Sequence, residues 1–265
     1  MIDQFDSILD RVRTIAREET TRTGPTAPDQ RKADGSWVTR TDTAIQTRVR
    51  AWLERQFPDI GFLGEEMPAH EQEQALTQGE RLWVLDPLDG TSNFRVGLPV
   101  YSTTLALIER GAVTFGLVYD PCRDEMFHAQ RGTGAYCNGA CMIRNNQPAR
   151  RLDQAIAAVD FKRLPARMAC QLATNPPYAS QRSIGSVALD WCWVAAGRFD
   201  VYVHGKQKLW DYAAGRLILE EAGGAHTTLQ ADVPPGLDLI PRSAVCATAP
   251  ALLDEWHAAL SRAAG

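Results

Sequence analysis

The sequence predicts a protein of the mixed α/β class, with an antiparallel sheet in its first half and alternating strands and helices in its second half. Three observations support this fold class. Residues 2–23 repeat apolar side chains at helical spacing, residues 101–129 contain apolar runs separated by short turns, and residues 155–224 alternate short apolar runs with helix-forming segments.

The composition is that of an ordinary soluble protein. The chain has 265 residues, 45% hydrophobic and 23% charged, and can bury a full core in one large domain or two abutting ones. Its net charge of −4 offers no basic surface, so nucleic acid is not expected as a partner. Six cysteines form no C-x-x-C pair, and no signal-like or membrane-spanning segment occurs. We therefore expect reduced thiols, a cytoplasmic location and no membrane partner.

The N-terminal segments are predicted to be two helices separated by a loop. Residues 2–23 form an amphipathic helix that supports the core. Residues 24–35 are polar and rich in Pro and Gly, which indicates a mobile loop. A helix capped within residues 36–42 then runs from Thr43 to Phe57 and ends before Pro58, because a residue that precedes proline disfavours the helical conformation.

The central motif is Asp86-Pro-Leu-Asp89-Gly-Thr91, which follows the short apolar run Leu82–Leu85. The run predicts a buried strand that ends in a turn and delivers two carboxylates into it. Carboxylates three residues apart converge only if the chain bends between them, which Pro87 and Gly90 permit. Converging carboxylates repel, so a hard cation such as Mg²⁺ is expected between them.

Two alternatives to a metal site at this motif remain open from the residues alone. An isolated Asp-Pro-x-Asp-Gly segment also occurs as a plain surface turn. The motif also looks like the Asp-x-Asp-Gly-Thr signature of haloacid dehalogenase type phosphatases with one residue inserted. That chemistry needs its nucleophilic Asp two residues before the second Asp, and here the spacing is three. Trapping of an aspartyl-phosphate on Asp86 would revive this alternative.

The remaining segments divide the chain into two predicted halves. Residues 101–108, 112–119 and 125–129 form an antiparallel meander that residues 135–137 extend, and the polar segment 144–153 is the candidate boundary between domains 1–145 and 146–265. In the second half, residues 155–161 and 199–204 are predicted strands. A first helix is predicted to begin near Gly185-Ser186 and to extend to about Gly197. Asp211 lies in the first turn of a second predicted helix. Residues 249–264 are predicted to form a C-terminal amphipathic helix.

Three segments together resemble the inositol monophosphatase family, a group of Mg²⁺-dependent and lithium-sensitive phosphatases related to fructose-1,6-bisphosphatases. They are Gly64-Glu65-Glu66, the central motif with Asn93-Phe94, and Trp210-Asp211 with the downstream Glu221-Ala-Gly-Gly224. The resemblance covers the chain from about Lys32 to Gly224. It implies a layered α-β-α-β-α sandwich, with an N-terminal α+β half, a C-terminal α/β half and the active site in the cleft between them. Homodimers are common in the family, so a homodimer is possible.

The resemblance also implies a role for each candidate residue. The ligands of two or three Mg²⁺ ions would be Glu65, Asp86, the Leu88 carbonyl, Asp89 and Asp211. Glu65 and Thr91 would orient the attacking water, Asp42 would orient Thr91, and Lys32 would be the loop lysine. The substrate contacts would be Leu88, Asp89, Gly90, Thr91, Gly185, Ser186, Val187, His204 and Asp211. An alternative role for Asp211 and Asp42 is helix capping alone. The alternative for Lys32 is a solvated position on the protein surface.

The implied activity is hydrolysis of a small phosphorylated metabolite, as in inositol-1-monophosphatase, by in-line attack of a metal-activated water. His204 departs from the family pattern, because it stands where inositol phosphatases carry an acid that holds inositol hydroxyls. Nearby Lys206 and Lys208 make this edge cationic, which would suit a second anionic group on the substrate, and a solvated surface loop is the alternative, favoured for Lys206. Related substrates therefore remain alternatives, namely fructose 1,6-bisphosphate, histidinol phosphate and 3′-phosphoadenosine 5′-phosphate. A non-catalytic interaction protein that retains the fold is a further alternative.

Overall fold

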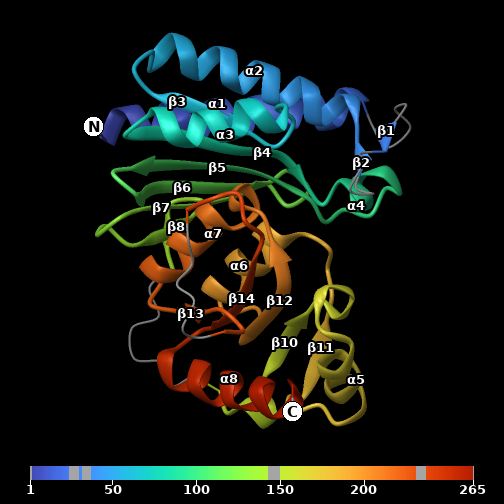
Figure 1. The fold of residues 1–265 in the computed structure, drawn as a ribbon. Helices are drawn as coiled ribbons and strands as arrows, with labels where there is room; N and C mark the ends of the chain where they lie inside the picture. Colours follow the sequence, from blue (N-terminus) through green and yellow to red (C-terminus); the bar gives the residue numbers. More distant parts are fainter. Residues whose placement is uncertain (1, 24–29, 32–36, 143–149, 231–236, 265) are drawn as a thin grey trace.

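The computed structural model describes residues 2–23, 30–31, 37–142, 150–230 and 237–264. Its elements stack in five layers of helices, sheet, helices, sheet and helices (Figure 1). The helices α1 (Ile2–Thr23), α2 (Arg40–Gln56) and α3 (Ala69–Gln78) form the first layer, and α6 (Val187–Ala195) and α7 (Leu209–Glu221) lie between the two sheets. The helices α5 (Ala166–Thr174) and α8 (Pro250–Ala264) form the last layer. The layered α/β fold expected from the resemblance is confirmed.

The larger sheet has seven strands in the order β3-β4-β5-β6-β7-β8-β9. Only the pair β3–β4 is parallel, and all other neighbours are antiparallel. The strands are β3 (Gly61–Gly64), β4 (Arg81–Asp89), β5 (Ser102–Glu109), β6 (Ala112–Asp120), β7 (Glu125–Gln130), β8 (Ala135–Cys137) and β9 (Ala140–Cys141). The predicted antiparallel meander is therefore correct.

Both faces of this sheet are covered, because apolar side chains on β4 alternate between two cores. Trp83 and Leu85 face α1 and α2, whereas Leu82 and Val84 belong to the core that contains α6 and α7. Helix α7 packs against the sheet so closely that a side-chain carbon at Gly116 of β6 would lie 2.8 Å from Ala214 Cα. The helices between the sheets thus belong to the packing of both chain halves.

The smaller sheet has five strands in the order β11-β10-β12-β14-β13. The strand β10 (Ile156–Val159) is parallel to β11 (Ser180–Arg182) and β12 (Val201–Gln207), whereas β14 (Arg242–Ala247) is antiparallel to β12 and to β13 (Ala225–Thr227). Two 3₁₀ turns, η1 (Leu152–Gln154) and η2 (Phe161–Arg163), flank β10. The proposed boundary between residues 145 and 146 lies outside the described residues, and the division into two domains stays a prediction.

Several local predictions need correction. The strand β4 does not end at Leu85 but continues to Asp89. Residues Trp37–Val38 form a short strand, β2, which pairs with β1 (Gln30–Arg31), and the following helix begins at Arg40 with Thr39 as its cap. Sequence reasoning also missed α3, α4 (Thr91–Arg95), α5, β13 and β14. These are short elements whose stability depends on tertiary packing.

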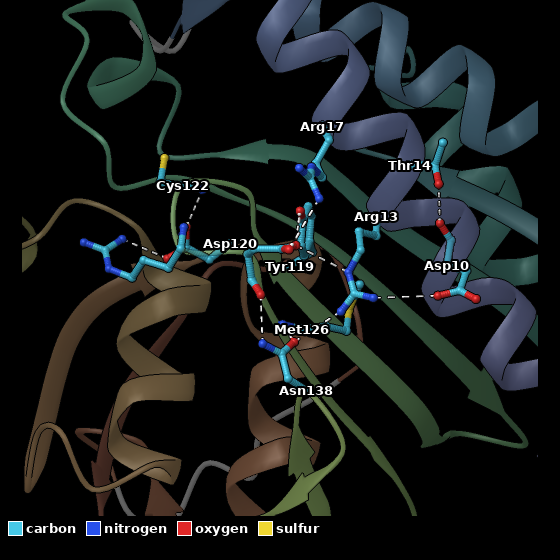
Figure 2. A network of polar contacts seen from close by, with 11 residues as sticks. Asp10, Arg13, Thr14, Arg17, Tyr119, Asp120, Cys122, Met126 and Asn138 are labelled. Atoms are coloured by element: carbon cyan, nitrogen blue, oxygen red, sulfur yellow. Dashed lines mark hydrogen bonds and ion pairs between the residues drawn. The ribbon is translucent and has the colours of Figure 1, made fainter.

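A polar network fastens α1 to the hairpin turns of the larger sheet, as Figure 2 shows. Arg13 Nη2 donates to Asn138 Oδ1 at 3.2 Å, and Arg17 Nη1 lies 3.3 Å from Asp124 Oδ2. The Tyr119 hydroxyl donates to the other oxygen of Asp124 at 2.8 Å. These contacts hold the outer helix layer in register with the sheet.

All six cysteines are free thiols, as expected from their spacing. Among the described helices, none combines the length and apolar character needed to cross a membrane.

Candidate active site

A bulge at the end of β4 brings two carboxylates of the central motif to one side of the strand. Asp86 is paired with Thr104 of β5 and Asp89 with Ser102. The chain therefore advances three residues on β4 but only two on β5, so β4 has one extra residue. Residues three apart on a regular strand point to opposite faces, and the extra residue cancels this alternation. The Leu88 N–H donates to Asp86 Oδ1 at 2.9 Å inside the bulge. The predicted bend between the two carboxylates is therefore a bulge within a continuous strand.

The start of α6 holds Asp89 with three hydrogen bonds. Ser186 Oγ donates to Asp89 Oδ2 at 2.5 Å, and the backbone N–H groups of Ala188 and Val187 donate to its two oxygens at 2.9 and 3.2 Å. Gly185, just before this helix, has a φ of +74°, a conformation that favours glycine. The predicted pocket residues Gly185, Ser186 and Val187 thus lie beside Asp89.

Two further carboxylates reach the same place from other elements. Glu65 follows β3, and its N–H donates to Leu85 O at 3.1 Å, which fixes it next to the parallel strand β4. Asp211 is the third residue of α7 and accepts a hydrogen bond from the Lys208 N–H at 2.8 Å. Capping thus accounts for one oxygen of Asp211. Both side chains line the pocket that contains Asp86 and Asp89.

Thr91 is held by two acceptors at the first turn of α4. Its hydroxyl lies 2.9 Å from Leu88 O and 3.2 Å from Asp42 Oδ1. Asp42 is fully buried, and its other oxygen accepts hydrogen bonds from the Thr39 N–H at 2.8 Å and the Thr39 hydroxyl at 2.5 Å. Asp42 is therefore both part of a capping box and a partner of Thr91. The N-cap residue itself is Thr39, and Asp42 completes the cap from the third helical position, so the capping alternative accounts for one of the two oxygens of Asp42.

The glycine between Asp89 and Thr91 is required by the local geometry. Gly90 has a φ of +90°, and a side-chain carbon there would lie 2.9 Å from Val100 O.

Lys32, the predicted loop lysine, lies outside the described residues, and its role stays a prediction.

Burial and mutual repulsion make the carboxylate cluster electrostatically unfavourable. Burial and the charges of Glu65, Asp89 and Asp211 raise the pKa of Asp86 well above its ordinary value. Burial and neighbouring acids also raise the pKa of Asp211 well above its ordinary value. For Asp89, burial raises the pKa to about 6, although the hydrogen bonds from the start of α6 oppose the shift. The pKa of Asp42 is likewise raised to about 6 by burial.

The donor set fits a hard divalent cation. Carboxylate oxygens and the Leu88 carbonyl are the ligand types that Mg²⁺ prefers, and the raised pKa values mean that these carboxyl groups would ionise more readily with a cation beside them. In the described part of the chain, however, no three His, Cys, Asp or Glu side chains already form a group that could hold an ion. Protein N–H and O–H donors instead engage Asp86, Asp89 and Asp211. Ion binding would require these carboxylates to turn toward a common centre.

The carboxylates open into a cavity of about 220 Å³. This volume lies below the range of about 300 to 1,000 Å³ that is typical of drug-sized ligands, and it favours a small metabolite. The predicted residues that line it are Glu65, Asp86, Leu88, Asp89, Gly90, Thr91, Gly185, Ser186, Val187, His204 and Asp211. Asp42 lies behind Thr91 and not on the cavity surface.

Sequence reasoning missed several lining residues, namely Trp37, Ser92, Asp160, Arg163 and Asp190. Trp37 belongs to the short hairpin β1–β2, and the Arg95 guanidinium lies 3.5 Å from its ring centroid. Arg163 belongs to η2, far from every motif in the chain. An aromatic residue or a charged turn residue in isolation carries no signal that could have indicated these positions.

His204 is not available to a ligand in the way the family resemblance suggested. Its Nδ1 accepts a hydrogen bond from the Lys206 N–H at 3.2 Å, and its Nε2 lies 3.2 Å from Asp160 Oδ2. A backbone N–H can only donate, so Nδ1 carries no proton and the ring proton resides on Nε2, facing Asp160. Both ring nitrogens are therefore occupied by protein groups.

A family model described as "Inositol monophosphatase family" matches residues 6–265, which is nearly the whole chain. The chain belongs to the inositol monophosphatase family. The resemblance inferred from the three motifs is thus confirmed, and membership in the inositol monophosphatase family supports a phosphatase.

Relatives of this inositol monophosphatase family member carry two kinds of name. A protein of Haemophilus influenzae named Nus factor SuhB is 37% identical over 198 residues, which cover 73% of this chain and 72% of that protein. An inositol-1-monophosphatase of Mesorhizobium japonicum is 31% identical over 230 residues, covering 82% and 79%. The solved structure of an IMPase/NADP phosphatase complexed with Mg²⁺ and phosphate is 26% identical in sequence and superposes with a TM-score of 0.83. The match covers 97% of this chain and 94% of that protein's chain.

Proposed function

We propose that this protein is a Mg²⁺-dependent phosphomonoester hydrolase that acts on a small phosphorylated metabolite, as inositol-1-monophosphatases do. The observation that carries the proposal is the cluster of Glu65, Asp86, Asp89 and Asp211 in one cavity, next to a threonine hydroxyl that a buried aspartate holds. Buried carboxylates that raise one another's pKa are costly for folding and are typical of functional sites. The solved relative complexed with Mg²⁺ and phosphate supports the choice of ion and reaction.

The residues divide the work between binding and positioning. Glu65, Asp86, Asp89, Asp211 and the Leu88 carbonyl would hold Mg²⁺, which lowers the pKa of a bound water and offsets the charge of a phosphate dianion. Thr91, held by Asp42, positions a water near the phosphate and passes a proton toward the Asp42 carboxylate. Glu65 supplies the second acceptor for that water. The bulge in β4 keeps both aspartates aimed into the same cavity.

The substrate class follows from the size and lining of the cavity. A volume of about 220 Å³ suits a sugar or polyol phosphate better than a polymer end. Inositol phosphate recognition would benefit from a carboxylate that accepts hydrogen bonds from adjacent hydroxyls, and His204 with both nitrogens engaged does not provide one. We therefore expect inositol 1-phosphate to be hydrolysed without strong preference.

The test is phosphate release from a panel of phosphomonoesters with Mg²⁺ as the variable. The panel contains inositol phosphates, sugar phosphates and bisphosphates, histidinol phosphate and 3′-phosphoadenosine 5′-phosphate. We expect turnover that requires Mg²⁺, is inhibited by excess Li⁺ and is lost in the Asp89→Asn variant. Turnover that survives exhaustive chelation would overturn the metal-dependent mechanism.

A second candidate function rests on the similarity to Nus factor SuhB of Haemophilus influenzae, whose name does not describe hydrolysis. On this candidate, the protein retains the fold and acts by binding another macromolecule. No turnover across the panel, together with intact Mg²⁺ binding, would favour it. The expectation that nucleic acid is not a partner stays a prediction.

A further inference from the structure

One carboxyl group of the cavity has no partner within the part of the chain that the structure describes. Among the described residues, six carboxyl side chains line the cavity, namely Glu65, Asp86, Asp89, Asp160, Asp190 and Asp211. Four of these are the proposed ligands of Mg²⁺. Asp160 is engaged by His204, whose Nε2 lies 3.2 Å from Asp160 Oδ2. Asp190 of α6 is the one that remains without a role.

Asp190 is nearly buried, yet the protein satisfies neither of its carboxyl oxygens. The residue is 6% exposed, and its Oδ1 is fully buried without a hydrogen-bond partner. Among the described residues, none donates a hydrogen bond to Oδ2, and this oxygen, unlike Oδ1, keeps contact with solvent. Because Asp190 lines the cavity, Oδ2 is the oxygen that a bound molecule can reach.

The surroundings of Asp190 make an unpartnered carboxyl group unfavourable. Its neighbours on α6, Leu189 and Trp191, are side chains of the apolar core. A polar group that is buried without a hydrogen bond destabilises a protein, unless a bound molecule supplies the missing partner. Burial also raises the pKa of Asp190 well above its ordinary value. A neutral carboxyl group has a donor and an acceptor, as a hydroxyl group does.

Helix α6 sets the position of Asp190 relative to the carboxylate cluster. The start of this helix holds Asp89 through the Ser186 hydroxyl. The Asp190 N–H donates to Ser186 O at 3.0 Å, so Asp190 lies one helical turn farther along the same helix. One turn rises about 5.4 Å, which is the length scale of a small sugar or polyol. A molecule whose phosphate reaches the carboxylate cluster can therefore present a hydroxyl group to Asp190.

We infer that Asp190 is a specificity-determining residue that binds one hydroxyl group of the substrate. The inference rests on the proposed function, since it takes the carboxylate cluster as the place where the phosphate binds. Asp190 supplies a hydroxyl partner that His204 does not, because both nitrogens of His204 are engaged by protein groups. The enzyme therefore prefers a sugar or polyol phosphate to an alkyl phosphate of the same length.

The experiment compares glucitol 6-phosphate with hexyl phosphate, which has the same carbon chain and no hydroxyl groups. The quantity measured is the ratio of their kcat/KM values. We expect the wild type to prefer glucitol 6-phosphate, and Asp190→Ala to reduce the ratio about tenfold, which is the effect of one lost hydrogen bond. Asp190→Asn keeps a donor and an acceptor and should retain most of the wild-type ratio. If Asp190→Ala does not fold, Asp190→Leu, which keeps the branch at Cγ, takes its place.

Two outcomes of this comparison overturn the inference and leave the proposed function intact. The first is a wild type that hydrolyses both compounds with similar kcat/KM. The second is an Asp190→Ala variant that loses activity on both compounds equally, so that the ratio stays at the wild-type value.

Thermal melts separate hydroxyl binding from a structural role and from a role in metal binding. Asp190→Ala should melt no lower than the wild type, because it removes an unpartnered buried group. A lower Tm would reveal a structural contribution of Asp190 and overturn the inference. Mg²⁺ should raise the Tm of this variant as much as that of the wild type. Loss of the Mg²⁺ effect would assign Asp190 to the ion and would also overturn the inference.

Asp200→Asn is the matched control. Asp200 is also buried, but it accepts hydrogen bonds from Arg150 and from the Ile156 N–H, and it does not line the cavity. This variant should melt lower than the wild type and keep the wild-type ratio of kcat/KM values. A ratio reduced as much as in Asp190→Ala would show a general effect of losing a buried carboxylate, against the inference.

If the wild type hydrolyses neither compound, the proposed function fails and equilibrium binding decides the role of Asp190. Calorimetric affinities for glucitol 6-phosphate and hexyl phosphate are then measured with the wild type, Asp190→Ala and Asp200→Asn. Tighter binding of glucitol 6-phosphate, lost in Asp190→Ala and kept in Asp200→Asn, supports the inference. Equal affinities of the wild type for both compounds overturn it.

Discussion

The Thr91 hydroxyl lies 3.2 Å from Asp42 Oδ1, although the two residues are 49 positions apart. The contact joins the end of β4 to the start of α2. The same carboxylate accepts the Thr39 N–H and hydroxyl through its other oxygen, so one buried group both completes a helix cap and holds the hydroxyl beside the acidic cluster. The position of Thr91 is thereby coupled to the stability of α2.

Replacing Thr91 with valine should reduce kcat by about 10² or more, because the variant keeps the shape of the side chain and loses the hydroxyl that positions the water. Thr91→Ser keeps the hydroxyl and should retain most of the activity. Phosphate release under saturating Mg²⁺ measures both. Wild-type turnover in Thr91→Val would rule out the assigned role, and a matching far-UV spectrum would exclude unfolding as the cause of any loss.

Asp86→Asn should stabilise the metal-free protein, because it removes one charge from a buried cluster of like charges. Mg²⁺ should raise the Tm of the wild type, by an amount equivalent to about 2.7 kcal/mol at 100 times the Kd. The variant should lose most of this increase. Thermal melts with and without Mg²⁺ test both effects. Asp59→Asn, at an exposed acid outside the cluster, is the control and should change neither. A metal-free Asp86→Asn protein that melts below the wild type would contradict the argument.

The ion-pair network at the end of α7 should make stability depend on pH. Burial raises the pKa of Glu220, but hydrogen bonds from His226 and Arg216 outweigh it and lower the pKa to about 2. A depressed pKa in the folded state stabilises the protein above the unfolded value of 4.5, and this contribution is lost as the pH falls from 4.5 toward 2.

Glu220→Gln should therefore cost about 1 kcal/mol near pH 7, a value that allows for the partial exposure of Glu220. The difference in unfolding free energy between wild type and variant should shrink as the pH falls from 4.5 toward 2. Denaturant unfolding at a series of pH values measures it. A difference that does not depend on pH would mean that the carboxylate contributes through packing and not through its charge.

The selectivity for inositol 1-phosphate should improve when a carboxylate is introduced at position 204 and its neighbour is neutralised. His204→Glu alone places a carboxylate opposite Asp160, so the two acids repel and the new side chain is poorly placed. The double variant with Asp160→Asn removes this conflict. We expect the kcat/KM ratio of inositol 1-phosphate to a generic sugar phosphate to rise about tenfold in the double variant, and less in the single variant. An unchanged ratio, with a wild type already selective for inositol, would show that position 204 does not set specificity.

Local patterns in the sequence were sufficient for the regular elements and for the motifs that identify the family. Helical spacing predicted α1 and α8, and period-two apolar runs with short turns predicted β5, β6 and β7, because each signal is contained in a few consecutive residues. The acidic residues Glu65, Asp86, Asp89 and Asp211 were all selected from their motifs, and all four line one cavity. Their roles as ligands stay predictions.

Only the tertiary structure revealed the features that depend on contacts between distant segments of the chain. The bulge in β4 depends on its register with β5, and the occupancy of both nitrogens of His204 depends on the contact between β12 and η2. Arg163 reaches the cavity only because Gly205 lets η2 approach β12. Such residues cannot be recognised from local sequence patterns. Their role depends on contacts between segments that are distant along the chain, and the spacing of residues within one segment does not predict those contacts.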